Sequence, residues 1–156
     1  MRAIKSCLWF ESAAEEAANH YVSIFPNSKV LNVMRAGSAV IAVDFVLDGT
    51  AFMALNGRKE AGFTDAVSFM VPCESQADVD RYWDALVSGG EEDRCGWLKD
   101  RYGVSWQIVP NELGSLLGDP DRAKAGRAMQ AMLGMRKLDI DAIRRARDGQ
   151  EAVSTS

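Results

Sequence analysis

Three side chains on predicted strands are the candidates in this sequence for acid–base or nucleophilic chemistry. Lys5 and Cys7 stand two positions apart in the segment IKSCLWF, and Lys99 lies in the segment CGWLKDRYGVSWQIVP. A lysine amine or a cysteine thiol can transfer a proton or attack an electrophilic carbon atom. A lone thiol within a strand is more often buried and inert, so the pattern favours a structural Cys7 over a catalytic one.

The only histidine, His20, falls inside a predicted helix. Catalytic and metal-binding histidines usually act in clusters, and the sequence contains no second histidine. A single histidine cannot form a histidine-rich metal site, and we interpret His20 as a structural residue. The sequence also lacks a G-x-S-x-G nucleophile elbow, a P-loop, and a G-x-G-x-x-G turn after a predicted strand.

The composition is that of an ordinary globular protein. The 156 residues are 47% hydrophobic and 26% charged, with a net charge of −4, which gives no general footprint for nucleic acid. No apolar run approaches the length of about 20 residues that a membrane span needs, and the N-terminus lacks a signal core. Three cysteines without C-x-x-C spacing predict reduced thiols and a cytoplasmic protein.

The elements that must position these groups repeat along the chain. Residues 4–10 and 66–73 both predict a strand, and each strand is followed by a Glu-Ser pair. The serines of these pairs, Ser12 and Ser75, lie 63 positions apart, and each precedes an acidic residue by three positions. This is a capping-box pattern, so each serine is expected to cap a helix. The recurrence indicates a duplicated supersecondary module.

Each predicted helix is followed by three strands. They cover residues 28–36, 39–48 and 50–56 in the first module, and 91–94, 96–100 and 103–110 in the second. The sum is βαβββ twice, an α+β architecture of curved antiparallel sheets with helices on one side. We expect a single domain over 1–147 and a flexible tail over 148–156. This domain contains module one (3–57), module two (66–110) and C-terminal helices (111–147). In those helices Met129, Met132 and Met135 form a stripe that we expect in the core or at a subunit contact.

Alternation along the strands predicts which side chains face a cavity. Trp106 shares a parity with its apolar strand neighbours and is expected to pack under the helices. Trp9 and Trp97 have the opposite parity to Leu8 and Leu98, so both tryptophans are expected on the concave side. A register slip of one residue would reverse each assignment.

Asn56 ends a predicted strand just after Phe52 and Ala54 on the same parity, and we expect it to face the cavity. A polar amide in such a place needs a partner. A ligand contact and a cap at the strand end remain equal alternatives for it.

Several segments together resemble a known family. They are CLWFESAAEEAANHYVSIFPNSKV, FMALNG, AVSFMVPCES, VDRYWDALVSGGEE, CGWLKDRYGVSWQIVP and AMQAMLGMRKLDI. They are similar to the PhnB-like family, long labelled demethylubiquinone methyltransferase-like. That family belongs to the vicinal-oxygen-chelate superfamily, with glyoxalase I, bleomycin-resistance proteins and extradiol dioxygenases. The resemblance covers about residues 3–142 and implies the glyoxalase-like fold.

The resemblance also implies where a metal would be held. In metal-dependent members the ligands come from the first and last strands of each module, positions that fall near Lys5, Asn56, Ala66 and Gln107. These residues offer no carboxylate and no imidazole, which disfavours glyoxalase or dioxygenase chemistry. The methyltransferase label lacks a cofactor-binding motif and looks like an inherited name.

The leading hypothesis is a homodimeric protein that binds a small organic ligand in its cavity without a metal or a cofactor. A second hypothesis is an enzyme that uses Lys5, Cys7 or Lys99 in the same cavity, and a third is an interaction module whose dimer surface is its function. The predicted lining combines aromatic walls with a few polar groups, which suits a partly planar ligand. It consists of Lys5, Cys7, Trp9, Phe52, Asn56, Ser68, Met70, Trp97, Lys99, Ser105 and Gln107.

Overall fold

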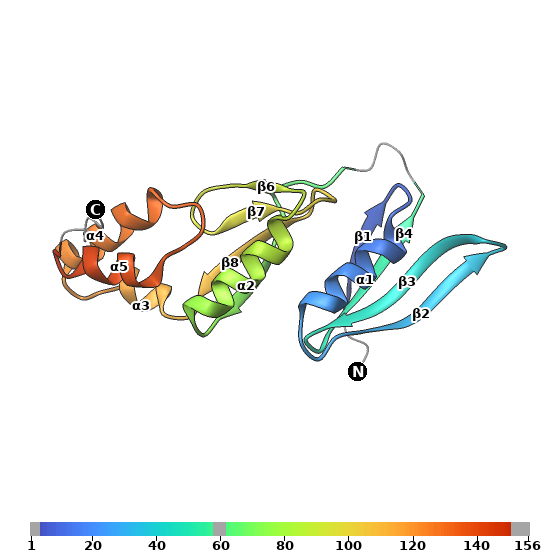
Figure 1. The fold of residues 1–156 in the computed structure, drawn as a ribbon, viewed down its shortest axis with the longest axis horizontal. Coiled ribbons are helices and arrows are strands. Elements are labelled where there is room, and N and C mark those ends of the chain that lie inside the picture. The colour runs from blue at the N-terminus through green and yellow to red at the C-terminus, as the bar shows by residue number, and fades with distance from the viewer. Residues whose placement is uncertain (1–3, 58–61, 151–156) are drawn as a thin grey trace. The chain divides into compact units, whose positions relative to one another are not determined.

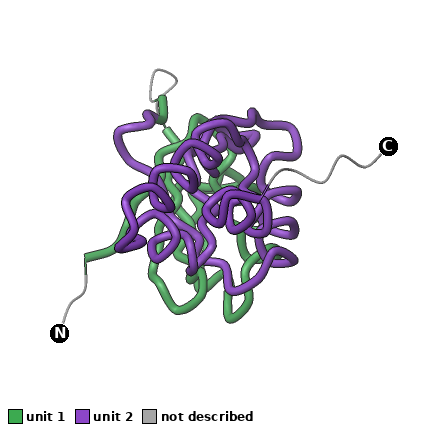
Figure 2. The backbone as a smooth tube through the Cα atoms, turned by 90° about the vertical axis from the view of Figure 1, so that its left-hand side faces the viewer, with its two compact units in different colours: residues 1–63 green, residues 64–156 purple. Residues whose placement is uncertain are grey.

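A computed structural model describes residues 4–57 and 62–150 of the chain (Figure 1). The chain divides into two units, residues 1–63 and residues 64–156, which Figure 2 colours separately. Each unit contains one four-stranded sheet. The strand orders are β1-β4-β3-β2 in the first unit and β5-β8-β7-β6 in the second, so the predicted duplication is confirmed.

The first unit has the predicted βαβββ order. Its elements are β1 (Ser6–Phe10), α1 (Ala14–Ile24), β2 (Lys29–Ala36), β3 (Ala39–Leu47) and β4 (Thr50–Asn56). The helix packs on one face of the sheet, because Ala14, Ala17, Ala18 and Tyr21 form a buried stripe at helical spacing (Figure 1). The hairpin between β3 and β4 turns at Asp48 and Gly49, which both have positive φ, and an Asp-Gly pair is a strong hairpin-turn sequence.

The second unit repeats this order and adds three helices. Its elements are β5 (Phe69–Cys73), α2 (Gln76–Val87), β6 (Glu91–Glu92), β7 (Trp97–Lys99), β8 (Ser105–Pro110), α3 (Leu113–Leu117), α4 (Arg122–Leu133) and α5 (Ile140–Arg147). Ser75 caps α2 as predicted: its hydroxyl accepts a hydrogen bond from the Asp78 amide at 3.2 Å and donates one to the Asp78 carboxylate at 3.0 Å.

Both sheets are mixed, which refines the expectation of antiparallel sheets. The first strand of each module pairs in parallel with the last, β1 with β4 and β5 with β8. The other strand pairs in each sheet are antiparallel. The parallel pair arises because a helix crosses over between the first strand and the hairpins that follow.

One predicted cap is wrong. Ser12 does not cap α1, whose N-cap is Ala13 without a side-chain hydrogen bond. The amide of Ala14 instead donates a hydrogen bond to Oδ1 of Asn56, at 2.9 Å, from the end of β4. A distant residue therefore satisfies a donor that the local pattern assigned to Ser12.

The C-terminal helices enclose a small core of their own. Leu116, Ala128, Leu138 and Ile143 are fully buried there, with Met132 and Met135 packed against them. Met129, by contrast, is 38% exposed, so the predicted methionine stripe is only partly core. Of the predicted tail, Gln150 still donates its amide to the carbonyl of Arg145 at 2.9 Å, and residues 151–156 lie outside the described residues.

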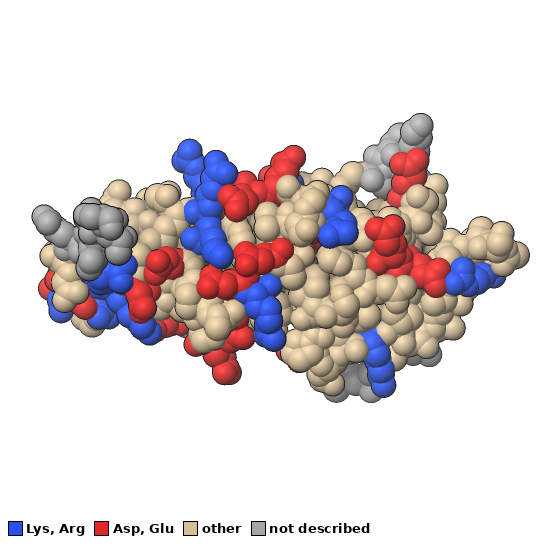
Figure 3. Space-filling model, in the orientation of Figure 1, with Lys and Arg blue, Asp and Glu red and all other residues tan. Residues whose placement is uncertain are grey.

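The surface carries charges of both signs. On the side drawn in Figure 3, most groups of Lys and Arg have Asp or Glu beside them. The ion pairs Arg35–Glu15 and Lys137–Asp80 are examples, at 2.6 and 3.1 Å. None of the helices within residues 4–57 and 62–150 has the length and apolar character needed to cross a membrane.

Candidate functional site

Each sheet has one face against its helix and one face that the helix leaves uncovered. We call the uncovered face of the first sheet, opposite α1, the first open face, and that of the second sheet, opposite α2, the second open face. Residues paired across neighbouring strands share a face, so the strand register decides which predicted site residues lie together.

The first open face brings together Lys5, Cys7 and Trp9. Cys7 pairs with Met53, which pairs with Asp44 on β3, so these three side chains lie side by side. Nζ of Lys5 forms an ion pair with Oδ1 of Asp44 at 2.5 Å. Trp9 is 37% exposed, which fits its predicted parity. Sequence reasoning missed both neighbours of Cys7 on this face: it read the alternation of β4, which carries Met53, in the wrong phase, and it assigned no face to Asp44 on β3.

Phe52 and Asn56 lie on the other face, which corrects their predicted place in the cavity. Phe52 is paired with Phe45 across the hairpin, and the two rings stack against each other with centroids 5.4 Å apart. Phe52 is buried on the helix side together with Leu8 and Ala54. Leu8, assigned to the helix side from the sequence, is paired with Ala54, and this register of β1 with β4 sets the phase of β4.

Asn56 acts as a cap at the strand end. Its Oδ1 accepts from the Ala14 amide at 2.9 Å, and its Nδ2 donates to the carbonyl of Val40 at 3.1 Å. Both ends of the side-chain amide thus hold the backbone of the first unit together. Of the two alternatives that the sequence left open for Asn56, the structure shows the cap.

The second open face brings together six of the eleven residues predicted to line the cavity: Ser68, Met70, Trp97, Lys99, Ser105 and Gln107. Gln107 of β8 is paired with Met70 on one side and with Trp97 on the other. Lys99 is paired with Ser105 two residues further along the same strands, on the same face. Nε2 of Gln107 also donates a hydrogen bond to Oγ of Ser68 at 2.8 Å, which places Ser68 beside this row.

A carboxylate that sequence reasoning missed also lies on the second open face. Oδ1 of Asp65 accepts from Nζ of Lys99 at 3.0 Å and from Oγ of Ser105 at 3.3 Å. The hydrogen bond from Lys99 lowers the pKa of Asp65, and the same bond raises the pKa of Lys99, with smaller contributions from Glu91 and Asp93. Lys99 is therefore a protonated cation at neutral pH.

The helix side of the second sheet is a closed polar and aromatic core. Trp106 is 3% exposed, and its Nε1 donates to Oδ2 of Asp100 at 2.8 Å. Oδ1 of the buried Asp100 accepts from the amides of Tyr102 and Val104, at 2.9 and 3.0 Å. The prediction that Trp106 is buried on the opposite side from Trp97 is confirmed. These hydrogen bonds from Tyr102, Val104 and Trp106 to Asp100 hold the β7–β8 turn against β8.

The four positions where relatives would hold a metal carry other contacts in this chain. Lys5 is paired with an aspartate, Asn56 caps a helix, and Gln107 is bonded to a serine. Ala66 lies in a turn before β5 and has no ligand atom. The donor set does not suit a divalent cation. Among residues 4–57 and 62–150, no three His, Cys, Asp or Glu side chains gather where they could hold one.

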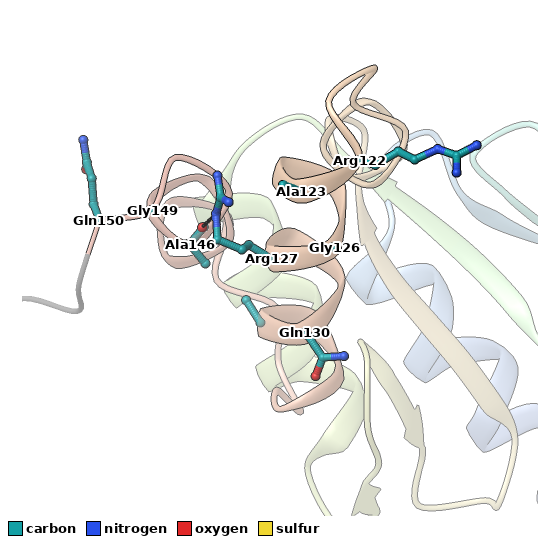
Figure 4. Close-up of a pocket in the computed structure, with 9 residues that line it drawn as sticks. Arg122, Ala123, Gly126, Arg127, Gln130, Ala146, Gly149 and Gln150 are labelled. Atoms are coloured by element: carbon teal, nitrogen blue, oxygen red, sulfur yellow. Dashed lines mark hydrogen bonds between the residues drawn. The ribbon is translucent and has the colours of Figure 1, made fainter.

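A separate open depression lies between α4 and α5 in the second unit (Figure 4). Small residues such as Ala123, Gly126 and Ala146 line it. Arg127 crosses it to reach the end of α5, where Nε donates to the carbonyls of Ala146 and Arg147 at 3.1 and 3.0 Å. Its guanidinium therefore ties the two helices together, and the depression is better explained as a helix junction than as a ligand site.

Comparison with known proteins places this fold in a family. The family model described as 3-demethylubiquinone-9 3-methyltransferase matches residues 2–109. A PhnB protein from Bacillus cereus that carries the same methyltransferase name is 32% identical, with a TM-score of 0.66 over 70% of this chain and 99% of that one. No curated protein matches the sequence.

More distant structures share the fold alone. A protein from Pseudomonas aeruginosa is 20% identical with a TM-score of 0.62, covering 70% of this chain and 98% of that one. The fosfomycin resistance protein FosX from Mesorhizobium loti is 13% identical with a TM-score of 0.51, covering 69% and 89%. The predicted fold class, a glyoxalase-like arrangement of two βαβββ modules followed by helices, is confirmed.

Proposed function

This chain belongs to the PhnB-like family of the vicinal-oxygen-chelate superfamily, and from that premise we propose that it binds a small, partly planar organic ligand without a metal ion. The methyltransferase name of the family is best explained as a misannotation. Methyl transfer from S-adenosylmethionine normally uses a doubly wound sheet with a glycine-rich first turn, whereas the described residues form two mixed sheets of four strands.

The second open face is the single observation that carries this proposal. It offers an aromatic ring and a thioether, from Trp97 and Met70, on either side of the polar Gln107. Next to them lies the protonated Lys99. Ligand sites combine such apolar surface with a few fixed polar groups, which give orientation and specificity. A flat ring can stack on Trp97 while its polar substituents reach Gln107 or Lys99.

Binding is favoured over catalysis because neither lysine suits nucleophilic or basic chemistry. A nucleophilic lysine needs a lowered pKa, and Asp65 raises that of Lys99. Lys5 is likewise engaged by a carboxylate, Asp44. Cys7 is the exposed thiol of the first open face and is the residue on which the enzyme alternative depends. Loss of a substrate-turnover signal in Cys7→Ser would support that alternative.

We also propose that the protein is a homodimer and that it resides in the cytoplasm. Besides Trp9, three large apolar side chains of the first sheet are exposed, Leu31 and Met34 on β2 and Ile41 on β3, and a partner copy would cover them. All three cysteines are free thiols, which suits a reducing compartment. Sedimentation at micromolar concentration should give a dimer, and a clean 17.1 kDa monomer would contradict it.

Native mass spectrometry of the protein purified from its host tests the proposal most directly, because a retained small molecule would give its own mass. Calorimetric titration with 2-naphthamide, a neutral planar probe, then locates the site. Trp97→Ala should weaken probe binding, while Met129→Ala, which truncates an exposed side chain on α4, should not. Unchanged binding in Trp97→Ala would remove the second open face as the ligand site.

A further inference from the structure

The second open face contains a carboxylate that does not come from the sheet. Asp65 lies in the turn that precedes β5, yet its side chain reaches the row formed by β7 and β8. There it accepts hydrogen bonds from Lys99 Nζ and Ser105 Oγ, at 3.0 and 3.3 Å. The sheet therefore presents an ammonium group and a hydroxyl that converge on one carboxylate.

The two donors are positioned by the sheet itself. Lys99 and Ser105 are directly paired between β7 and β8, so their side chains stand next to each other. Ser105 is only 2% exposed, and such a buried hydroxyl is held in place by its surroundings. Trp97 and Gln107 are the next pair along the same two strands and the same face. A planar ring and a carboxylate position thus lie one pair apart.

Asp65 itself is held loosely. Its side chain is 61% exposed, and the backbone hydrogen bonds beside it are local, from the Ala66 amide to Thr64 Oγ1 at 3.2 Å and from the Val67 amide to the Thr64 carbonyl at 3.5 Å. Exposed ion pairs of this kind contribute little to folding. A ligand carboxylate can replace Asp65 at Lys99 while its ring adds apolar contact that Asp65 lacks.

We propose that the second open face selects planar organic ligands that carry a carboxylate, and that Asp65 occupies the carboxylate position between Lys99 and Ser105 until such a ligand displaces it. The inference rests on the proposed function and adds the chemical class of the ligand and an internal competitor.

Two further carboxylates limit what this position accepts. Glu91 is paired with Lys99 across β6 and β7, and Asp93 follows near Trp97. Both act on Lys99 electrostatically, together with Asp65. They repel a ligand anion, so a single negative charge is preferred over two. For the same reason, removal of the Asp65 charge should have a large effect on anion binding.

Three matched probes test this by calorimetric titration at neutral pH: 2-naphthoate, 2-naphthamide and 2-naphthylmethylammonium. Their rings are the same and their charges are −1, 0 and +1. We expect 2-naphthoate to bind about tenfold or more tightly than 2-naphthamide, as a charge-assisted hydrogen bond allows. Asp65→Asn should tighten binding of 2-naphthoate several-fold and leave 2-naphthamide nearly unchanged. Lys99→Met should abolish the preference between these two probes.

Lys5→Met is the matched control, because it removes the lysine of the other ion-paired face and should leave the preference intact. Asp65→Ser and Lys99→Gln serve as second variants, and circular dichroism confirms that each variant folds. Equal binding of naphthoate and naphthamide, no gain in the Asp65 variants, or tightest binding of the ammonium probe would overturn the inference while the proposed function stands. If none of the three probes binds, both fall.

Discussion

The two modules begin with the same local sequence pattern and cap their helices in different ways. In the second module Ser75 caps α2 from the position next to the helix. In the first module Ser12 occupies the equivalent place in the sequence but makes no cap, and Asn56 supplies an acceptor from the end of β4, the strand next to β1. The position that pairs like Asn56 in the second sheet is Pro110, which has no side-chain acceptor.

The open faces of the two modules differ in a related way. On the first, Lys5 is neutralised by Asp44 from a strand of the same sheet. On the second, Lys99 is met by Asp65 from a turn outside the sheet. Duplication kept the scaffold, whereas the source of each polar partner diverged. Of the two carboxylates, Asp65 is the more exposed, at 61% against 31% for Asp44, which supports our proposal of ligand recognition on the second face.

The largest expected effect is a loss of folding stability, and it compares the buried cores of the two sheets. Phe52 and Trp106 are both buried on the helix side of the last strand of their modules. Truncation to alanine should cost about 3–5 kcal/mol in each case. Trp106→Ala should cost more than Phe52→Ala, because it also leaves the buried Asp100 without the indole donor. Urea unfolding of both variants measures the difference.

Trp106→Phe isolates the hydrogen bond, since it keeps an aromatic ring but removes Nε1, and should cost about 1–3 kcal/mol. The control is Trp97→Ala on the second open face, which should be the least destabilising of the four. If Trp97→Ala destabilises more than Trp106→Ala, the assignment of the two faces is wrong.

The next expected effect is a difference in thiol reactivity between Cys7 and Cys73, which lie on the first strands of the two modules. Cys7 is exposed on the first open face, whereas Cys73 ends β5 on the buried side. Burial raises the pKa of the Cys73 thiol to about 11 from 9.0, which alone lowers its reactive thiolate fraction about 100-fold at neutral pH. Iodoacetamide should label Cys7 in the native protein and Cys73 only after unfolding, as peptide mass spectrometry can read. Equal labelling rates would contradict the register of both strands.

Four variants at the helix caps test the opening comparison itself. Asn56→Ala should cost about 2 kcal/mol, because it removes both the cap of α1 and the bond to Val40. Ser75→Ala should cost about 1 kcal/mol, and Ser12→Ala should have almost no effect. Asn56→Asp keeps the acceptor for Ala14 and loses the donor, so it should fall between wild type and Asn56→Ala. A substantial loss in Ser12→Ala would show that Ser12 caps α1 in solution.

The smallest effect is the pH dependence of the Asp65–Lys99 pair. Lys99 holds the pKa of Asp65 below its ordinary value of 3.8, so the pair stabilises the fold above that pH. The contribution is lost as the pH falls through the lowered pKa. Melting temperatures of wild type and Asp65→Asn should differ slightly near neutral pH and converge in acid. A difference that grows in acid would contradict the pairing, and a large drop at neutral pH would contradict its loose attachment.

Local patterns in the sequence determined most of the fold. The repeated strand–helix order, the Asp48–Gly49 turn, the Ser75 cap and the burial of Trp106 each follow from neighbours within a few positions. Period-2 and period-3.6 patterns suffice for such features, because they report the backbone conformation and one buried face. The family resemblance pointed to the same architecture.

Only the tertiary structure decided the features that join distant segments. The parallel pairing of β1 with β4 fixed the phase of β4 and moved Phe52 and Asn56 to the helix side. It also brought Asn56 to the start of α1, where it replaced Ser12. Asp65 reaches Lys99 over 34 positions of chain, across a turn whose direction no local periodicity encodes. Strand alternation specifies that two faces exist, but the phase of each face depends on partners that the chain supplies from elsewhere.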